Sequence, residues 1–213
     1  MVATVSARLA ECVDCPRLVA LRKEVRRQYP EYHAGPVPAW GRRDARLLIV
    51  GLAPGMHGAN RTGQPFTGDA SGTFLFRALA KAGFSTHPDA CEARLINTRI
   101  TNAVKCLPPA NKPIAAELNQ CRTYLEEELD VLRGRTHRRP RCVLCLGRLA
   151  HEAVGRALAE NIPLFAHGRH SEITAQFWLA DTYHPSRQNT NTGRLTESML
   201  DGVLRRVAEL LDG

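Results

Sequence analysis

The sequence predicts an α/β protein of three layers, with helices on both faces of a mainly parallel central sheet. Two observations support this fold class. Short apolar runs alternate along the chain with longer segments whose apolar residues recur at helical spacing. The first run, residues 46–51 (RLLIVG), is apolar after Arg46, as is typical of a strand buried on both faces. At 213 residues the chain suffices for one well-packed domain, and we expect a single domain over residues 1–213.

The elements of the first half follow from these patterns and from the positions of proline and glycine. Proline interrupts a helix, and segments rich in proline and glycine favour loops. In chain order we expect a helix over 6–28 broken at Pro16, a loop over 30–44, a strand over 46–51, a glycine-rich loop over 51–69, and a helix from about Ser71.

The second half continues the alternation of strands and helices. In chain order we expect a strand over 95–104, a helix over 113–133 with Pro113 in its first turn, a strand over 141–146, a helix from about Arg148, a strand over 173–183, and a helix over 195–212. Because loops at the carboxyl ends of parallel strands gather around one crevice, the loops after Gly51, Asn102 and Tyr183 should meet there.

The charge of the chain is the first indication of function. It has 29 Lys and Arg residues against 21 Asp and Glu residues, a formal net charge of +8. A basic surface favours a polyanion such as DNA, although a generally basic proteome would also give this charge. No segment approaches the roughly 20 apolar residues of a membrane helix, and Arg8 and Glu11 interrupt the start of the chain, so we expect no secretory signal. We expect a cytoplasmic monomer that does not bind membranes.

Seven cysteines are many for a reducing compartment and favour metal or redox chemistry over disulfides. Cys12 and Cys15 form one local pair, and Cys106 and Cys121 form another farther along the chain. Four thiolates in two pairs can hold an iron–sulfur cluster or a zinc ion. The pattern alone does not decide between the two metals, or between a metal site and unconnected thiols.

The remaining cysteines are expected to be structural. Cys142 and Cys145 have the same C-x-x-C spacing but lie in an expected strand, where residues three apart point to opposite faces. They cannot converge on one metal, so we interpret both as buried thiols. Cys91 stands alone and is expected to be inert.

Three loops carry residues suited to binding and chemistry. In the first, Phe66 could stack on a base or anchor the core, and Asp69 could act in chemistry or as the acid at a helix N-terminus. In the second, the amide of Asn102 could bind the edge of a pyrimidine or form a turn. In the third, Pro185 keeps His184 extended, so His184 points into the crevice or lies in a surface turn. The polar, basic residues 187–194 after it are expected to be flexible and to follow a phosphate backbone.

Together these segments resemble the family 5 (type b) uracil-DNA glycosylases. The matching motifs are GLAPG at 51–55, PFTGD at 65–69, TNAVKC at 101–106 with Cys121, and HPS with NTGRLT between 184 and 196. They occur in the family's order from Cys12 to about Leu200. The resemblance implies a uracil-DNA glycosylase fold and a monofunctional DNA-repair hydrolase. Such an enzyme excises uracil, and other deaminated or modified bases, from DNA without a lyase step.

The resemblance also assigns roles to individual residues. It implies a [4Fe–4S] cluster on Cys12, Cys15, Cys106 and Cys121. It gives base stacking to Phe66, the base-edge contact to Asn102 and the position of the second-motif histidine to His184. From the chemistry that excision needs, we expect base binding by Gly51, Leu52, Ala53, Phe66, Asn102 and His184, and catalysis by Asp69, Asn102 and His184. The polar, basic segment is expected to bind DNA through Ser186, Arg187 and Arg194.

One position departs from the related family 4. Enzymes of that family carry a glutamate where this sequence has Leu52, so the acid that positions water there is absent, and Asp69 is the candidate to replace it. The alternatives are a family 4-like enzyme restricted to uracil, a non-catalytic iron–sulfur protein that binds nucleic acid, and a structural zinc protein.

Overall fold

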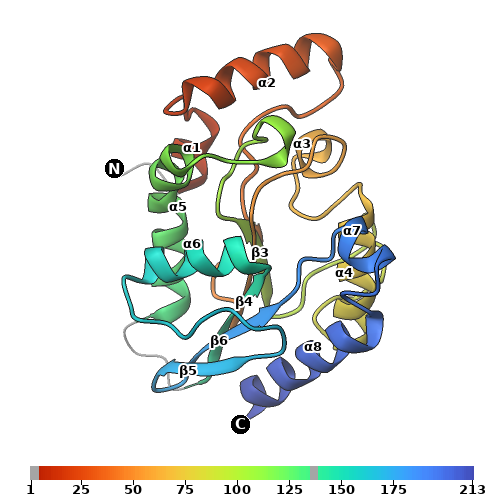
Figure 1. The fold of residues 1–213 in the computed structure, drawn as a ribbon, viewed down its shortest axis with the longest axis vertical. Helices are drawn as coiled ribbons and strands as arrows, with labels where there is room; N and C mark the ends of the chain where they lie inside the picture. The colour runs from red at the N-terminus through yellow and green to blue at the C-terminus, as the bar shows by residue number, and fades with distance from the viewer. Residues whose placement is uncertain (1–4, 135–138) are drawn as a thin grey trace.

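The computed structural model describes residues 5–134 and 139–213, and it has the predicted α/β architecture (Figure 1). Within these ranges six strands form one sheet in the order β1-β3-β2-β4-β6-β5. The inner strands β3, β2, β4 and β6 are parallel, and the edge strands β1 and β5 are antiparallel to their neighbours. The strand bounds are β1 Trp40–Gly41, β2 Leu47–Gly51, β3 Thr98–Asn102, β4 Arg141–Leu146, β5 His170–Thr174 and β6 Phe177–Thr182.

Helices cover both faces of the sheet, which makes three layers. On one face α4 and α8 pack against alternate residues of the inner strands, such as Leu47 and Leu144. On the other face α5 and α6 cover the residues between them, such as Leu48 and Val143. The helices are α1 Val5–Ala10, α2 Pro16–Gln28, α3 Ala59–Thr62, α4 Ala70–Lys81, a 3-10 turn at Pro109–Asn111, α5 Ala115–Arg133, α6 Arg148–Leu158, α7 Arg187–Asn191 and α8 Glu197–Asp212.

Strands β2 and β4 are apolar, apart from Arg141 at the start of β4, because both of their faces are buried. Every residue of β2 and of β4 is buried. Cys142 lies in the core under α4 and α8, whereas Cys145 lies in the core under α5 and α6. The prediction that these two thiols are buried on opposite faces is therefore confirmed. Among the described helices, none has both the length and the apolar composition required to cross a bilayer.

Several expected elements differ from those observed. The strand predicted over 173–183 is a hairpin, in which β5 turns through Gln176 (φ 62°) into β6. The loop predicted over 30–44 contains the two-residue edge strand β1. Helix α5 begins after Pro113, because the side chain of Glu117 accepts a hydrogen bond from the backbone N–H of Ile114 and so caps the helix at that residue.

The polar segment that follows β6 also differs from its prediction. Residues 187–194 were expected to be flexible, but the structure places the short helix α7 at Arg187–Asn191. Ser186 caps this helix with its hydroxyl, which accepts from the backbone N–H of Asn189 at 3.4 Å. The segment is therefore held in a defined position beside the end of β6.

A buried ion pair ties the loop after β3 to α5. Lys105 is fully buried, and its ammonium lies 2.9 Å from a carboxylate oxygen of Glu128 on α5. The same ammonium donates to the hydroxyl of Thr101 on β3. An unpaired charge at such a depth would be strongly unfavourable, so the two side chains require each other.

This dependence gives a first prediction. Replacing Glu128 by Gln leaves the Lys105 ammonium buried without a counter-charge and should reduce the free energy of unfolding by about 3 kcal/mol or more. Urea unfolding followed by circular dichroism measures the loss. Glu209→Gln is the control, because its pair with Arg206 is exposed and should contribute well under about 1 kcal/mol. Equal losses in the two variants would contradict the prediction.

Candidate active site

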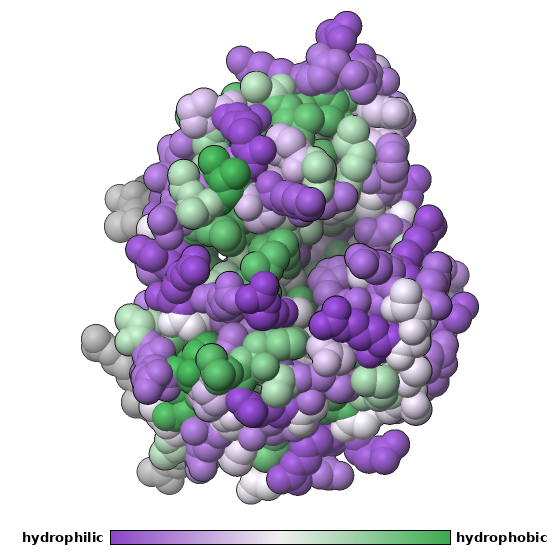
Figure 2. All heavy atoms as spheres, viewed as in Figure 1, coloured by the Kyte–Doolittle hydropathy of each residue, from purple (hydrophilic) through white to green (hydrophobic). Residues whose placement is uncertain are grey.

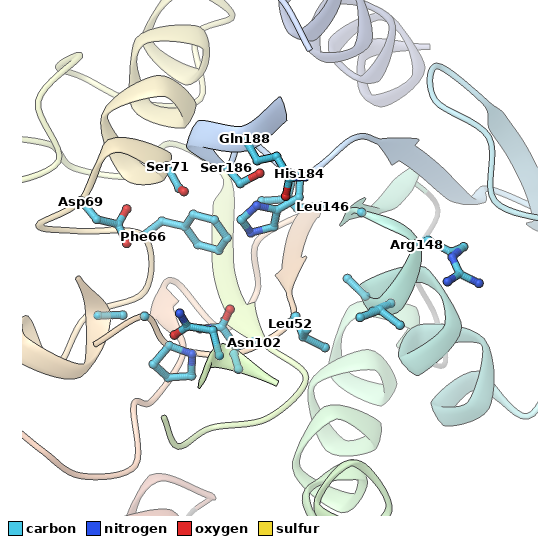
Figure 3. Close-up of a pocket in the computed structure, with 18 residues that line it drawn as sticks. Leu52, Phe66, Asp69, Ser71, Asn102, Leu146, Arg148, His184, Ser186 and Gln188 are labelled. Carbon is cyan, nitrogen blue, oxygen red and sulfur yellow. The ribbon is translucent and has the colours of Figure 1, made fainter. Parts of the chain in front are cut away.

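A cavity of about 540 Å³ lies at the carboxyl ends of the four parallel strands (Figure 3). Its wall combines the loop after β2, the end of β3, the junction of β4 with α6, and the segment after β6. In the space-filling view, apolar side chains gather in a hollow near the middle of the face, between polar groups (Figure 2). The predicted gathering of these loops around one crevice is therefore observed.

Gly51 makes room for two side chains of the cavity. A Cβ at this position would lie 2.5 Å from Oδ1 of Asn102 and 2.7 Å from the ring of Phe66, both far below contact distance. Gly51 itself lies behind the wall, while its neighbours Leu52 and Ala53 line the cavity. The close approach of three segments at this point requires glycine.

Phe66 anchors the core and also lies in the wall of the cavity. The side chain is buried and belongs to the core under α4 and α8. Its ring centre lies 6.0 Å from that of His184, with the two planes inclined by 39°. Its φ of 55° is rare for a residue with a side chain and aims the ring at this point. The cavity thus has a flat apolar face next to a histidine.

Asn102 ends β3 with an unsatisfied carbonyl group. The residue is 3% exposed, and no donor in the part of the chain that the structure describes reaches its Oδ1. A buried polar atom without a partner costs about 1 to 3 kcal/mol, so its presence at a cavity wall indicates that a ligand supplies the missing donor. An N–H group on the edge of a base is such a donor.

Asp69 lines the cavity and also caps α4. One carboxylate oxygen accepts from the backbone N–H of Gly72 at 2.9 Å, which is the helix N-terminal role. The other oxygen lies beside Gly55 and Gly58, and a Cβ on Gly58 would come within 2.2 Å of it. The cap therefore fixes a carboxylate group in the wall of the cavity (Figure 3).

His184 lies deep in the cavity at the end of β6. Burial lowers the pKa of its imidazole below the ordinary value of 6.5, and the nearby charge of Asp69 only partly offsets this effect. The ring is therefore neutral at pH 7 and has one N–H to donate. Its backbone is held as well, because its carbonyl accepts from the side chain of Asn189 at 2.8 Å.

The other residues predicted to bind DNA lie at or beyond the cavity's edge. Ser186 lines it, whereas Arg187 and Arg194 are exposed and do not. The guanidinium of Arg194 lies 4.7 Å above the ring of Tyr183, which also stacks on the ring of His167 at 4.8 Å and contacts that of Phe165 at 6.0 Å. Arg194 therefore supports the segment that carries His184 in addition to offering a positive charge.

The four cysteines of the two predicted pairs line one small cavity away from this site, between α2 and α5. The backbone N–H of Lys105 donates to the thiol sulfur of Cys121 at 3.2 Å. Arg22 donates to the sulfur of Cys106 at 3.9 Å and to the carbonyl of Cys12 at 3.0 Å. Burial raises the pKa of the Cys106 thiol to about 12 and that of Cys121 to about 11. The folded chain thus brings together the four residues that the sequence paired.

A second group that could hold a metal ion was not predicted. Ligand atoms of Cys145, His151 and Asp181 lie within 4.8 Å of one another and are buried. The carboxylate of Asp181 already contacts Nδ1 of His151 at 2.8 Å and accepts from the backbone N–H of Ala166 at 3.4 Å. These contacts satisfy the carboxylate without a metal.

Sequence reasoning missed the part of the cavity wall at the start of α6. Gly147, Arg148 and Leu149 line the cavity, and Leu149 is 47% exposed there. Gly147 has a φ of 94° and lies against His184, where a Cβ would be 3.2 Å from the histidine's own Cβ. The sequence does contain a signal for this part of the wall, because Gly147 lies between the parallel strand β4 and the helix α6 that follows it.

Comparison with known proteins agrees with this geometry. The family model of the uracil DNA glycosylase superfamily matches residues 38–208. A type-5 uracil-DNA glycosylase of Pyrobaculum aerophilum is 46% identical over 94% of this chain and 89% of its own length. Type-5 uracil-DNA glycosylases of Thermus thermophilus and Mycobacterium leprae are 44% and 43% identical, over 95% and 96% of this chain and 94% and 93% of their own lengths.

The environment of His184 gives a second prediction. Its imidazole should titrate below pH 6.5 by NMR, and Asp69→Asn should lower this pKa further, because the Asp69 charge is what raises it. A His184→Asn variant identifies the resonance. Asp44→Asn, which removes a distant carboxylate paired with Arg42, is the control and should leave the titration unchanged. An unchanged pKa in Asp69→Asn would show that the Asp69 charge does not act on His184, and a raised pKa would contradict the predicted sign.

Proposed function

The chain belongs to the uracil DNA glycosylase superfamily and is a DNA-repair glycosylase that excises uracil from DNA, and we propose that it does so in the cavity at the ends of the parallel strands. The observation that carries this assignment is the convergence of Phe66, Asp69, Asn102 and His184 on that one cavity. These residues come from three segments, the loop after β2, the end of β3 and the segment after β6. Together they offer a stacking face, a base-edge contact, a carboxylate and a neutral imidazole.

Base recognition follows from the first two groups. An enzyme that acts on a base must take it out of the stack and hold it in a pocket. The ring of Phe66 supports one face of the base. The unsatisfied Oδ1 of Asn102 accepts the N3–H of uracil, which gives this buried oxygen the donor it lacks within the described chain. Cytosine has no hydrogen on N3, so the same contact disfavours the normal base.

Bond cleavage uses the other two groups. The bond between N1 of the base and C1′ of the sugar breaks with its electron pair on the base, which leaves an anionic uracil and a sugar cation. The N–H of neutral His184 and backbone N–H groups of the 51–55 loop donate to the anionic base. The carboxylate of Asp69 stabilises the cation and orients a water, whose oxygen bonds to C1′ while its proton passes to the carboxylate and then to the departing base.

The wall at position 52 distinguishes this site from the family 4 type. Leu52 lines the cavity where that family has a glutamate, so Asp69 is the acidic group proposed for the reaction. With Leu52 in place of a glutamate the cavity wall is less polar, and such a wall discriminates less strictly against bases other than uracil. We therefore propose that deaminated or modified bases other than uracil are also substrates, and we do not favour a uracil-only enzyme of the family 4 kind.

We also propose a [4Fe–4S] cluster on Cys12, Cys15, Cys106 and Cys121. Four thiol sulfurs around one cavity are the donor set that such a cluster requires. The backbone N–H of Lys105 and the guanidinium of Arg22 supply donors to sulfur, which suit an anionic cluster. When bound, the cluster would act as a structural cross-link. The cysteines would then join the start of α2, the loop after β3 and α5.

DNA with uracil or other damaged bases is the proposed partner, and we expect the enzyme to act as a monomer in the cytoplasm. Ser186, at the cavity edge, and the exposed cations Arg187 and Arg194 are proposed to contact the phosphate backbone. The net charge of +8 supports binding that weakens as salt increases.

A third prediction separates the two roles of Asp69. Asn is also a good helix cap, so Asp69→Asn should keep the thermal stability of the protein while it removes the charge. Single-turnover excision from a uracil oligonucleotide, detected by alkaline cleavage, should fall by about 100-fold or more. Asp69→Ala should lose excision and should also lower the thermal stability, because it removes the cap of α4. Excision near the wild-type rate in Asp69→Asn would reduce Asp69 to a helix cap.

A fourth prediction concerns the cysteines. Cys121→Ala should give protein without visible absorption or bound iron and with poor solubility, because cluster binding is coupled to folding. Cys142→Ala is the matched control. It removes a buried thiol from the core under α4 and α8 and should retain the brown colour and the iron. Brown, stable Cys121→Ala protein with a full iron content would refute the assignment.

A further inference from the structure

An aromatic cluster outside the cavity has no role in the reaction described above. It consists of Tyr29, Tyr32 and His57. The tyrosine rings stack with centres 4.6 Å apart, and the imidazole meets both edge-on at 5.9 and 6.0 Å. The hydroxyl of Tyr32 lies 2.9 Å from Nδ1 of His57. The three rings are therefore fixed relative to one another.

The aromatic cluster is open to solvent. His57 is exposed, and both tyrosines are only partly buried against the small core of Val25 and its neighbours. Stability of the fold does not explain why these rings lie at the surface, because a tyrosine ring contributes more to packing when it is buried more deeply. A rigid set of rings at the surface instead provides a flat face on which another ring can stack.

The helix that leads to the aromatic cluster is strongly basic. Helix α2 carries five cations, Arg17, Arg22, Lys23, Arg26 and Arg27, and a single acid, Glu24. Arg17 and Arg27 are paired with carboxylates. Arg22 donates to the sulfur of Cys106 and to the carbonyl of Cys12, so its charge belongs to the cysteine site. Within the described ranges no carboxylate pairs with Lys23 or Arg26, and Arg26 donates to the backbone carbonyls of residues 33 and 34. The aromatic cluster thus adjoins the uncompensated charges of Lys23 and Arg26.

The aromatic cluster is continuous with the active site. His57 lies two residues after Gly55, which lines the cavity, in the same loop that follows β2. Farther along this loop Arg61 donates to the carbonyl of Gly68, next to Asp69. In Figure 1, α2 and α3 lie on the same side of the sheet's carboxyl edge. The aromatic cluster and α2 therefore lie on the side of the cavity that the loop after β2 forms.

We propose that the aromatic cluster and the basic side of α2 form a second DNA-binding surface, which holds an unpaired stretch of the strand that carries the excised base. The proposal rests on the proposed function, because the strand is the one whose base enters the cavity. Base stacking on tyrosine requires a base that is not paired in a duplex, and cations along α2 suit its phosphates. The surface therefore favours single-stranded flanks over duplex flanks.

The test measures binding of full-length protein to single-stranded oligonucleotides that contain 2′-fluoro-deoxyuridine, which resists excision. Fluorescence anisotropy compares flanks of two nucleotides with flanks of about ten, a length within the range of single-strand sites. Wild-type protein should bind the long oligonucleotide more tightly. The double variant Tyr29→Ala/Tyr32→Ala should lose about ten-fold or more of the affinity for the long oligonucleotide and keep that for the short one.

Two further variants separate stacking from folding and from general charge. Tyr32→Phe keeps the ring, loses the contact with His57, and should retain most of the gain with length. Lys23→Gln should reduce the salt dependence only with long flanks. Arg205→Gln removes an exposed cation from α8, at the opposite end of the molecule in Figure 1, and should change neither measurement.

The outcomes distinguish this proposal from the proposed function. Wild-type protein that does not cut uracil would refute the glycosylase assignment, whatever its length dependence. Excision of uracil from an oligonucleotide of the same short length, with deoxyuridine in place of the 2′-fluoro analogue, should be the same in the tyrosine double variant and in wild type. If the folded double variant keeps the full gain with length, or if duplex flanks give the same gain as single strands, the second surface is refuted.

Discussion

The absence of a side chain at Gly51 is the constraint on which the site depends. Asn102 and Phe66 come from different parts of the chain, and both occupy the space that a Cβ at Gly51 would take. Larger residues would push the strand end of β3 away from the loop after β2 and would turn the Phe66 ring toward the solvent. Asn102 and Phe66 therefore pack directly against the backbone of Gly51, and this contact determines how precisely the two side chains are positioned in the cavity.

The sequence is sufficient to predict the inner part of the sheet, because its physical signal is local. A strand covered on both faces must be apolar along nearly its whole length, and residues 47–51 and 142–146 meet this condition. The β5–β6 hairpin could not be seen in the same way. Its turn contains Gln176 in a left-handed conformation and has no glycine or proline, so the alternating pattern continues through it.

The same holds for the site, where residues marked by a local sequence pattern could be predicted and residues brought together only by tertiary packing could not. Phe66, Asn102, Asp69 and His184 could be found because each lies at the end of a parallel strand or in the loop that follows one, where the carboxyl ends face the crevice. The group formed by Cys145, His151 and Asp181 could not be found. Its histidine and aspartate are 30 residues apart, and only the packing of α6 onto β4 and β6 brings them together.

Asp69 shows why structural and functional interpretations of one residue need not compete. A carboxylate on a flexible loop would have to be ordered each time a substrate bound. Here one oxygen is held by the N-terminus of α4, whose helix dipole also favours a negative charge at that place. The second oxygen is thereby fixed in the wall of the cavity. The helix cap supplies the preorganisation that electrostatic stabilisation of a cation requires, so the structural role is what makes the proposed chemical role effective.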